Sequence, residues 1–194
     1  MNYDALLIVS FGGPEGMEDV MPFLENVVRG RNVPRERLLG VAHHYEMFGG
    51  VSPINQQNRN LIAALEEELQ KNGPALPIYW GNRNWNPFLA DALREMATDG
   101  IKNALAFVTS AYSSFSSCRQ YQQNIAAAQS EVGPSAPRVE KLRAFYNHPL
   151  FIEANVDRIV RTAFQMLEAG AHLVFTAHSI PESMAAECDY AAQL

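Results

Sequence analysis

The chain has 194 residues, 47% of them hydrophobic, and a formal net charge of −6; this length allows one substantial core, or one domain and part of another. The acidic balance argues against a nucleic-acid surface, because phosphate binding needs clustered Lys and Arg. The apolar stretches are far shorter than the ~20 residues of a membrane-spanning helix, and no basic start precedes the first of them, so we expect a cytoplasmic protein without a secretory signal.

Short apolar runs alternate with longer amphipathic segments along the chain. The runs at residues 5–9 and 104–108 are continuously apolar, which is typical of strands buried on both faces of a sheet. In chain order, the expected elements are strand Ala5–Ser10, helix Asn55–Lys71, strand Leu76–Gly81, helix Phe88–Met96, strand Ala104–Thr109, strand Arg138–Leu142, helix Leu150–Ala169 and strand His172–Ala177.

This βαβα succession predicts an α/β fold with a doubly wound, Rossmann-like parallel sheet and helices on both faces. The pattern restarts with a long helix and a strand after the fourth expected strand. We expect residues 1–143 to form a nearly complete first domain, and residues 144–194 to begin a second. One strand and one helix would leave the second sheet with an open edge, so this domain is predicted to be incomplete.

Unusual loops follow the strands, and the carboxyl ends of parallel strands meet at one edge of a sheet. The paired glycines after Phe11 let the backbone approach a ligand closely, although a plain strand-to-helix turn is the alternative. The loops are rich in amides, hydroxyls and aromatic rings, which together predict a crevice for a large planar molecule with polar edges. They comprise Phe11–Glu15, His43–Pro53, Gly81–Pro87 and Ser110–Tyr121.

The stretch His43–Pro53 favours a flat aromatic ligand over a metal ion. On a helix, the neighbours His43 and His44 diverge by about 100° and cannot both face one metal. Met47 and Phe48 are large apolar side chains, for which we expect packing in the core.

His178 is the first candidate for a metal ligand or a base. It stands where the last expected strand opens into a loop, which in α/β folds is the edge that binds ligands. The alternative is a histidine that satisfies local loop backbone. The two cysteines, Cys118 and Cys188, are too few and too far apart for a disulfide framework or a CxxC zinc site, and both are predicted to be reduced, buried thiols.

Three segments of the sequence resemble motifs of the ferrochelatases of haem biosynthesis. Phe175–Pro181 resembles the family's histidine signature, Tyr45–Pro53 resembles a segment on its porphyrin side, and Gly81–Pro87 resembles a third motif of the family. The resemblance covers essentially the whole chain and is strongest to bacterial enzymes that metallate coproporphyrin III or protoporphyrin IX. It implies a chelatase-like fold and the insertion of Fe²⁺ into one of these porphyrins.

The resemblance also implies roles for individual residues. His178 would face the porphyrin centre and bind Fe²⁺ as the catalytic residue. Phe11 stands where some members carry a tyrosine that ligates iron in the product, a contact that phenylalanine cannot make. Arg29 adjoins Val28, the position nearest a family arginine that binds a propionate. The macrocycle and its propionates would be held by His44, Tyr45, Ser52 and Tyr121.

Insertion of Fe²⁺ requires the pyrrole N–H protons to leave, so a neutral imidazole can serve as metal ligand or proton acceptor. In the family, the histidine works with a glutamate further downstream, and this chain ends before that position. Neither Glu182 nor Glu187 occupies it. Because the family's C-terminal cluster cysteines also lie beyond this end, no iron–sulfur cluster or other cofactor is expected besides the substrate Fe²⁺.

Two alternatives remain open at this point. One is a related chelatase that acts on another tetrapyrrole or metal, such as cobalt, and pairs two half-length chains into a dimer. The other is a non-catalytic porphyrin-binding fragment. Besides porphyrin and Fe²⁺, the expected partners are a second copy of the chain, bound through the open strand edge, and transient contacts with a membrane or a haem-pathway protein.

Overall fold

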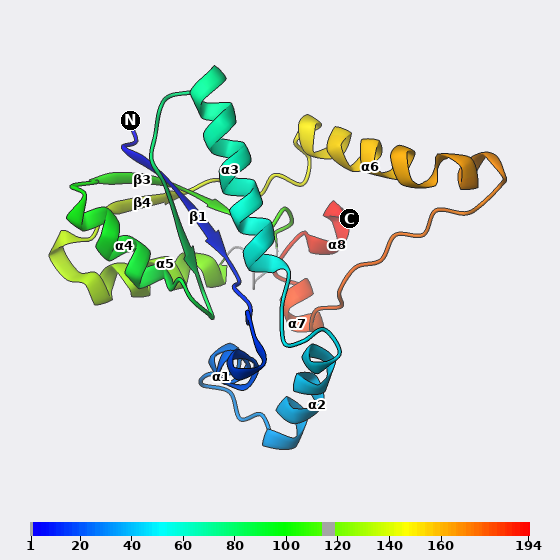
Figure 1. Ribbon diagram of the computed structural model, residues 1–194, viewed down its shortest axis with the longest axis horizontal. Coiled ribbons are helices and arrows are strands. Elements are labelled where there is room, and N and C mark those ends of the chain that lie inside the picture. The colour runs from blue at the N-terminus through cyan, green and yellow to red at the C-terminus, as the bar shows by residue number, and fades with distance from the viewer. Residues whose placement is uncertain (1, 114–118) are drawn as a thin grey trace. The chain divides into compact units, whose positions relative to one another are not determined.

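The computed structural model describes residues 2–113 and 119–194, which divide into two compact units. Unit 1 comprises Met1–Thr109 and Tyr121–Leu142, and unit 2 comprises Ser110–Gln120 and Arg143–Leu194. The elements of both units are labelled in Figure 1. No helix among the described residues is both long enough and apolar enough to cross a membrane.

Unit 1 is built on a parallel sheet, which has four strands in the described part of the chain, in the order β2-β1-β3-β4. β1 lies inside the sheet, where Leu7 pairs with Tyr79 on one side and Ala106 on the other. The predicted parallel sheet and its first four strands are thus confirmed, with small shifts at the ends. The strands are β1 (Ala5–Ser10), β2 (Ile78–Asn82), β3 (Asn103–Val108) and β4 (Arg138–Lys141).

Helices cover both faces of this sheet, as the doubly wound pattern predicts. α4 (Leu89–Thr98) and α5 (Gln120–Val132) bury their apolar residues against one face, together with Tyr79 of β2. Trp80 points to the opposite face, because successive side chains alternate along a strand. There the guanidinium of Arg59, from α3 (Ile54–Asn72), lies 5.6 Å from the Trp80 ring.

α1 (Met17–Val27) and α2 (Arg35–Glu46) follow the loop after β1 and were not among the predicted helices. They pack on each other through a small second core around Phe23. A short 3-10 turn, Gly133–Ser135, links α5 to β4. The buried members of the second core are Val20, Phe23, Leu24, Leu38 and Ala42.

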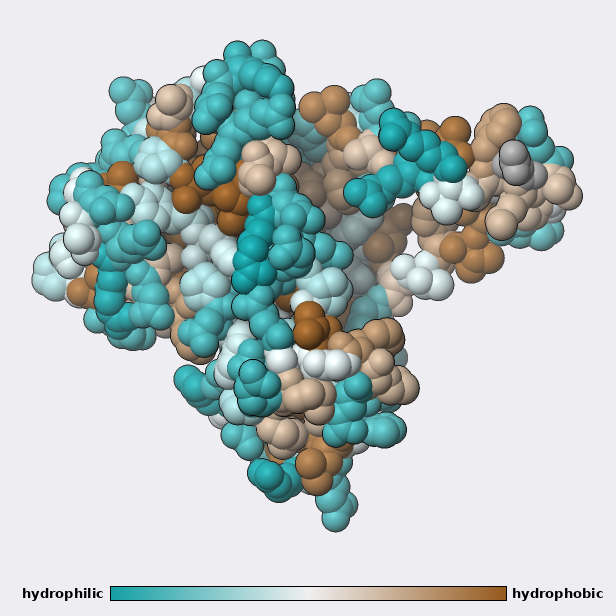
Figure 2. Space-filling view, in the orientation of Figure 1, coloured by the Kyte–Doolittle hydropathy of each residue, from teal (hydrophilic) through white to brown (hydrophobic). Residues whose placement is uncertain are grey.

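Unit 2 contains α6 (Pro149–Glu168), α7 (Glu182–Ala185) and α8 (Tyr190–Gln193). The ring of Tyr112 makes edge-to-face contacts with Phe151 and Tyr190 at 6.3 Å. Apolar residues remain at the surface of α6 in Figure 2, where Ile152, Val156 and Val160 are exposed.

The predicted strand His172–Ala177 is wrong, because these residues form no strand in the described part of the chain. Val174 and Phe175 are both 78% exposed. The apolar run has strand-like composition, but a strand also needs a neighbour with which its backbone N–H and C=O groups can pair. The structure describes no such neighbour for this segment, so His178 does not follow a strand.

Candidate functional site

The loops after β1 and β2 meet the start of α3 at the carboxyl edge of the sheet in unit 1. The Arg83 N–H donates to the carbonyl oxygen of Ser10 at 2.9 Å, and the Ser52 N–H donates to that of Pro14 at 2.8 Å. Parallel strands β1 and β2 are neighbours, so their loops leave the sheet side by side. This arrangement brings Phe11 and Ser52, two predicted substrate-binding residues, to the same edge.

Phe11 packs between an aromatic ring and a cation. Its ring centroid lies 6.1 Å from that of Phe23, and the guanidinium of Arg83 lies 5.8 Å from the Phe11 centroid. Arg83 is half-buried, and the pKa of its guanidinium is lowered by burial and, more weakly, by the nearby charge of Arg31. No carboxylate pairs with Arg83 among the described residues. Its position therefore favours an anionic group beside Phe11.

A mainly apolar cavity of about 780 Å³ gathers three of the predicted substrate-binding residues, His44, Tyr45 and Ser52. Tyr45 is half-buried, its ring packs edge-to-face on Phe23 at 6.0 Å, and burial raises the pKa of its hydroxyl. The cavity thus combines apolar walls with a few hydroxyl and imidazole groups. Its lining consists of Val41, His44, Tyr45, Phe48, Val51, Ser52 and Pro53.

The prediction that Met47 and Phe48 pack in the core is wrong. They are 64% and 73% exposed, and Phe48 forms part of the wall of the apolar cavity. Both residues follow the last residue of α2, in the turn where Gly49 and Gly50 adopt positive φ. The turn carries these side chains away from the α1–α2 core, which leaves large apolar groups available to a ligand.

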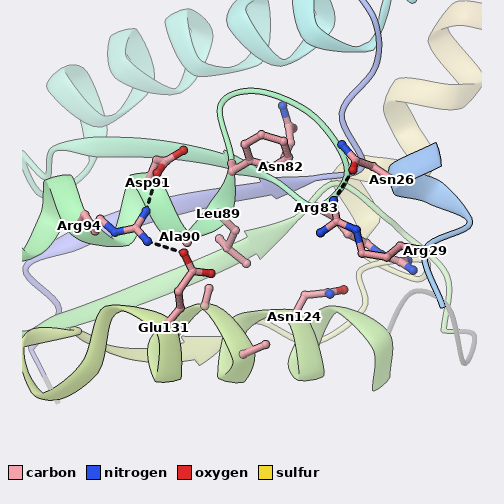
Figure 3. Close-up of a pocket in the computed structure, with 13 residues that line it drawn as sticks. Asn26, Arg29, Asn82, Arg83, Leu89, Ala90, Asp91, Arg94, Asn124 and Glu131 are labelled. Atoms are coloured by element: carbon pink, nitrogen blue, oxygen red, sulfur yellow. Dashed lines mark hydrogen bonds and ion pairs between the residues drawn. The ribbon is translucent and has the colours of Figure 1, made fainter. Parts of the chain in front are cut away.

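A second cavity, of about 460 Å³, is lined by the ends of α1 and β2 and by α4 and α5. Figure 3 shows Arg29 and Arg83 at one end of it, while Arg94 lies at the other end between Asp91 and Glu131. Arg29 donates to Oδ1 of Asn26. This polar cavity therefore contains Arg29, but not the other predicted substrate-binding residues.

Tyr121 is only 6% exposed and packs in the core between the sheet and α5. Burial raises the pKa of its hydroxyl to about 12, although the positive charge of Arg83 acts in the opposite direction. Among the described residues that line the two cavities, Tyr121 is absent. Residues 114–118 of the predicted Ser110–Tyr121 loop, which include Cys118, lie outside the described residues.

His178 belongs to unit 2 and is exposed. Its Nδ1 lies 2.6 Å from the carbonyl oxygen of Ser179. Because a carbonyl oxygen only accepts hydrogen bonds, Nδ1 carries the proton, and the lone pair of the neutral ring is on Nε2. Nε2 can therefore bind a metal ion or accept a proton. Within the described ranges, no three His, Cys, Asp or Glu side chains converge as a metal site would require.

Sequence reasoning did not select Arg83 as a site residue, although it noted the loop Gly81–Pro87. Arg83 is recognised as a site residue by its contact with Phe11, which is distant in the sequence. This contact forms only after β2 has paired with β1. Val41 and Val51 were also not selected, since isolated valines carry no chemical signature.

The model of the ferrochelatase family matches residues 3–194. A ferrochelatase of Rhodopirellula baltica is 60% identical over 194 residues, which cover 99% of this chain and 55% of that protein. The coproporphyrin III ferrochelatases of Streptomyces coelicolor and Mycolicibacterium smegmatis are 54% and 53% identical, over 94% and 97% of this chain and 50% and 56% of their own length. The chain spans about half the length of the curated relatives that it matches.

Proposed function

Because this chain belongs to the ferrochelatase family, we propose that it supplies the porphyrin-binding part of an enzyme that inserts Fe²⁺ into a porphyrin in haem biosynthesis. The observation that carries the proposal is the apolar cavity of about 780 Å³, bordered by Tyr45, Phe48 and Ser52. Apolar walls with a few polar groups suit a flat macrocycle whose edges bear carboxylates.

We further propose coproporphyrin III as the porphyrin. It carries more propionate groups than protoporphyrin IX, and each propionate needs a cationic or hydrogen-bonding partner. Arg83 and Arg31 are close enough for their charges to interact, and Arg29 lines the same cavity as Arg83. The names of the relatives from Streptomyces and Mycolicibacterium support the same substrate.

In this proposal, the neutral Nε2 of His178 binds the incoming Fe²⁺ or accepts a pyrrole proton as the metal enters the ring. Phe11 offers an apolar face with no ligating atom, so it contacts the macrocycle without holding the iron. Tyr45 stays protonated at neutral pH, since an ordinary tyrosine hydroxyl has a pKa of about 10 and burial raises the pKa of this one further. Tyr45 therefore contributes a neutral hydroxyl and a ring face to the wall of the site.

The test is a fluorescence titration of the 194-residue chain with coproporphyrin III and, separately, with protoporphyrin IX. We expect saturable quenching, with tighter binding of coproporphyrin III, and a weaker affinity in Tyr45→Ala. Equal affinity for both porphyrins would refute the substrate assignment. Absence of saturable binding would refute the proposed function.

The role of His178 is tested with His178→Ala, which removes an exposed side chain and should leave porphyrin affinity unchanged. Anaerobic addition of Fe²⁺ to the porphyrin complex is followed by absorbance. We expect the metalloporphyrin bands to form with the wild-type chain and to be absent in the variant. Insertion at the wild-type rate in His178→Ala would contradict the assignment.

A further inference from the structure

Asn55, the second residue of α3, is a buried amide that joins three segments of the candidate site. It is 0% exposed. Its Nδ2 donates to the carbonyl oxygens of Gly13 at 3.1 Å and Asn86 at 3.4 Å, and its Oδ1 accepts from Nδ2 of Asn82 at 3.4 Å. One side chain thus connects the loop after β1, the start of α3 and the loop after β2.

The joined segments carry Phe11, Ser52 and Arg83. A Cβ built on Gly13 would lie 2.6 Å from the Cβ of Ser52, so the loop after β1 and the start of α3 are already in close contact. They have no room to approach further, and the Asn55 amide opposes their separation. The spacing between these candidate substrate residues is therefore fixed from both directions.

We propose that Asn55 is a positioning residue for porphyrin binding, which holds Phe11, Ser52 and Arg83 at fixed separations without touching the substrate. This inference rests on the proposed function. An asparagine amide has two N–H donors and a carbonyl acceptor, and at Asn55 all of these groups contact the loops. Binding residues must keep their geometry to within about 0.5 Å, so the loss of such a support weakens binding at a distance.

Asn58 provides a matched control. It lies one turn further along α3 and is 3% exposed, but its Nδ2 has no hydrogen-bond partner in the described part of the chain. Asn58→Ala also removes a buried side-chain amide from α3, but it removes no hydrogen bond to either loop. Loss of buried volume and of helix packing affects both variants, whereas loss of loop support affects only Asn55→Ala.

The first measurement is the Kd for coproporphyrin III, at a temperature at which circular dichroism shows both variants to be folded. We expect Asn55→Ala to raise Kd about tenfold, which corresponds to about 1.4 kcal/mol. Asn58→Ala should change it by less than about twofold. Equal losses in the two variants, or no loss in Asn55→Ala, would overturn the positioning role.

Asn55→Asp tests the hydrogen bonds themselves. It keeps the size of the side chain, but an ionised carboxylate cannot donate to the carbonyl oxygens of Gly13 and Asn86. Burial favours the protonated acid, which regains one donor. Relative to wild type at the same pH, the loss of affinity should be large near pH ~8 and shrink towards pH ~5. Wild-type affinity of Asn55→Asp over this whole pH range would show that these bonds do not control binding.

Hydrogen exchange gives a readout that needs no ligand. The Ser52 N–H donates to Pro14 in the loop after β1, and the Arg83 N–H donates to Ser10 at the end of β1, so both amides should exchange faster in Asn55→Ala than in Asn58→Ala. Unchanged exchange at both amides would refute the positioning role even if porphyrin binds. If the wild-type chain binds no porphyrin, the proposed function fails, while the exchange data still decide whether Asn55 positions the loops.

Discussion

Gly50 occupies a turn in which an added methyl group would meet backbone. Its φ is +77°, and a Cβ built on it would lie 2.5 Å from the nitrogen and 2.6 Å from the Cα of Met17. The neighbouring Gly49 also has a positive φ, +66°, but a Cβ there would meet nothing within 4 Å. An alanine at position 49 would therefore introduce backbone strain alone, whereas an alanine at position 50 would add steric overlap with Met17.

The expected losses of stability follow from these environments. A left-handed conformation costs an alanine about 1–2 kcal/mol, and the lower entropy of the unfolded alanine chain returns about 0.4–1 kcal/mol. Gly49→Ala should therefore lower the free energy of unfolding by about 1 kcal/mol. Gly50→Ala adds overpacking against rigid backbone, typically about 1–3 kcal/mol, for a total of about 2–4 kcal/mol.

Urea unfolding followed by tryptophan emission measures both variants, with linear extrapolation to water. Gly50→Ala should also weaken porphyrin binding, because the Gly50 N–H donates to the Tyr45 carbonyl oxygen at 2.8 Å, in the wall of the apolar cavity. Gly49→Ala should bind porphyrin as the wild type does. Unfolding free energies of the two variants within about 0.5 kcal/mol of each other would refute the reasoning, since the overlap with Met17 would then cost nothing.

Three further predictions concern stability and binding. Burial raises the pKa of the Tyr121 hydroxyl to about 12, whereas in the unfolded chain this pKa is about 10. The neutral hydroxyl therefore stabilises the folded state fully below about pH 10. This stabilisation, of up to about 3 kcal/mol, is lost as the pH rises from about 10 to about 12. Urea unfolding of Tyr121→Phe should show a smaller loss over that interval. Phe48→Ala should change the free energy of unfolding by less than about 0.5 kcal/mol, because the ring is 73% exposed, yet weaken porphyrin binding about tenfold in the fluorescence titration. Thermal unfolding should show a loss of about 2–5 kcal/mol for the buried Leu93→Ala and less than about 1 kcal/mol for Arg94→Ala, whose ion pairs are solvent-exposed.

The sheet of unit 1 was predictable because its strands carry their own signal. Residues 5–10 form a nearly continuous apolar run, and β1 has the predicted bounds, Ala5–Ser10. A strand that is buried on both faces of the sheet favours such a run, since side chains on either face pack against other apolar groups. The run at residues 172–177 has similar composition but lacks a pairing partner in the described chain, so composition alone predicted a strand that does not form.

The helices α1 and α2 were not predicted, for separate physical reasons. Pro22 lies inside α1, and proline in a helix interior removes a backbone donor and normally argues against a helix. α2 buries only Leu38 and Ala42 along its length, so it lacks the apolar stripe by which surface helices are identified. Both helices are stabilised by contacts with each other, and such tertiary contacts leave no pattern in the local sequence.

In the candidate site as well, some residues could be predicted from the sequence and others could not. The apolar cavity is lined by residues 41–53, a single stretch whose aromatic, imidazole and hydroxyl groups were conspicuous in the sequence. Arg83 and Asn55 could be identified as site residues only from the folded structure. Their roles depend on contacts with Phe11 and Gly13, which form across the sheet edge once β2 has paired with β1. Side chains that touch a ligand share chemistry with it and can be recognised by type. Side chains that hold those residues in place share only geometry, and the fold is needed to find them.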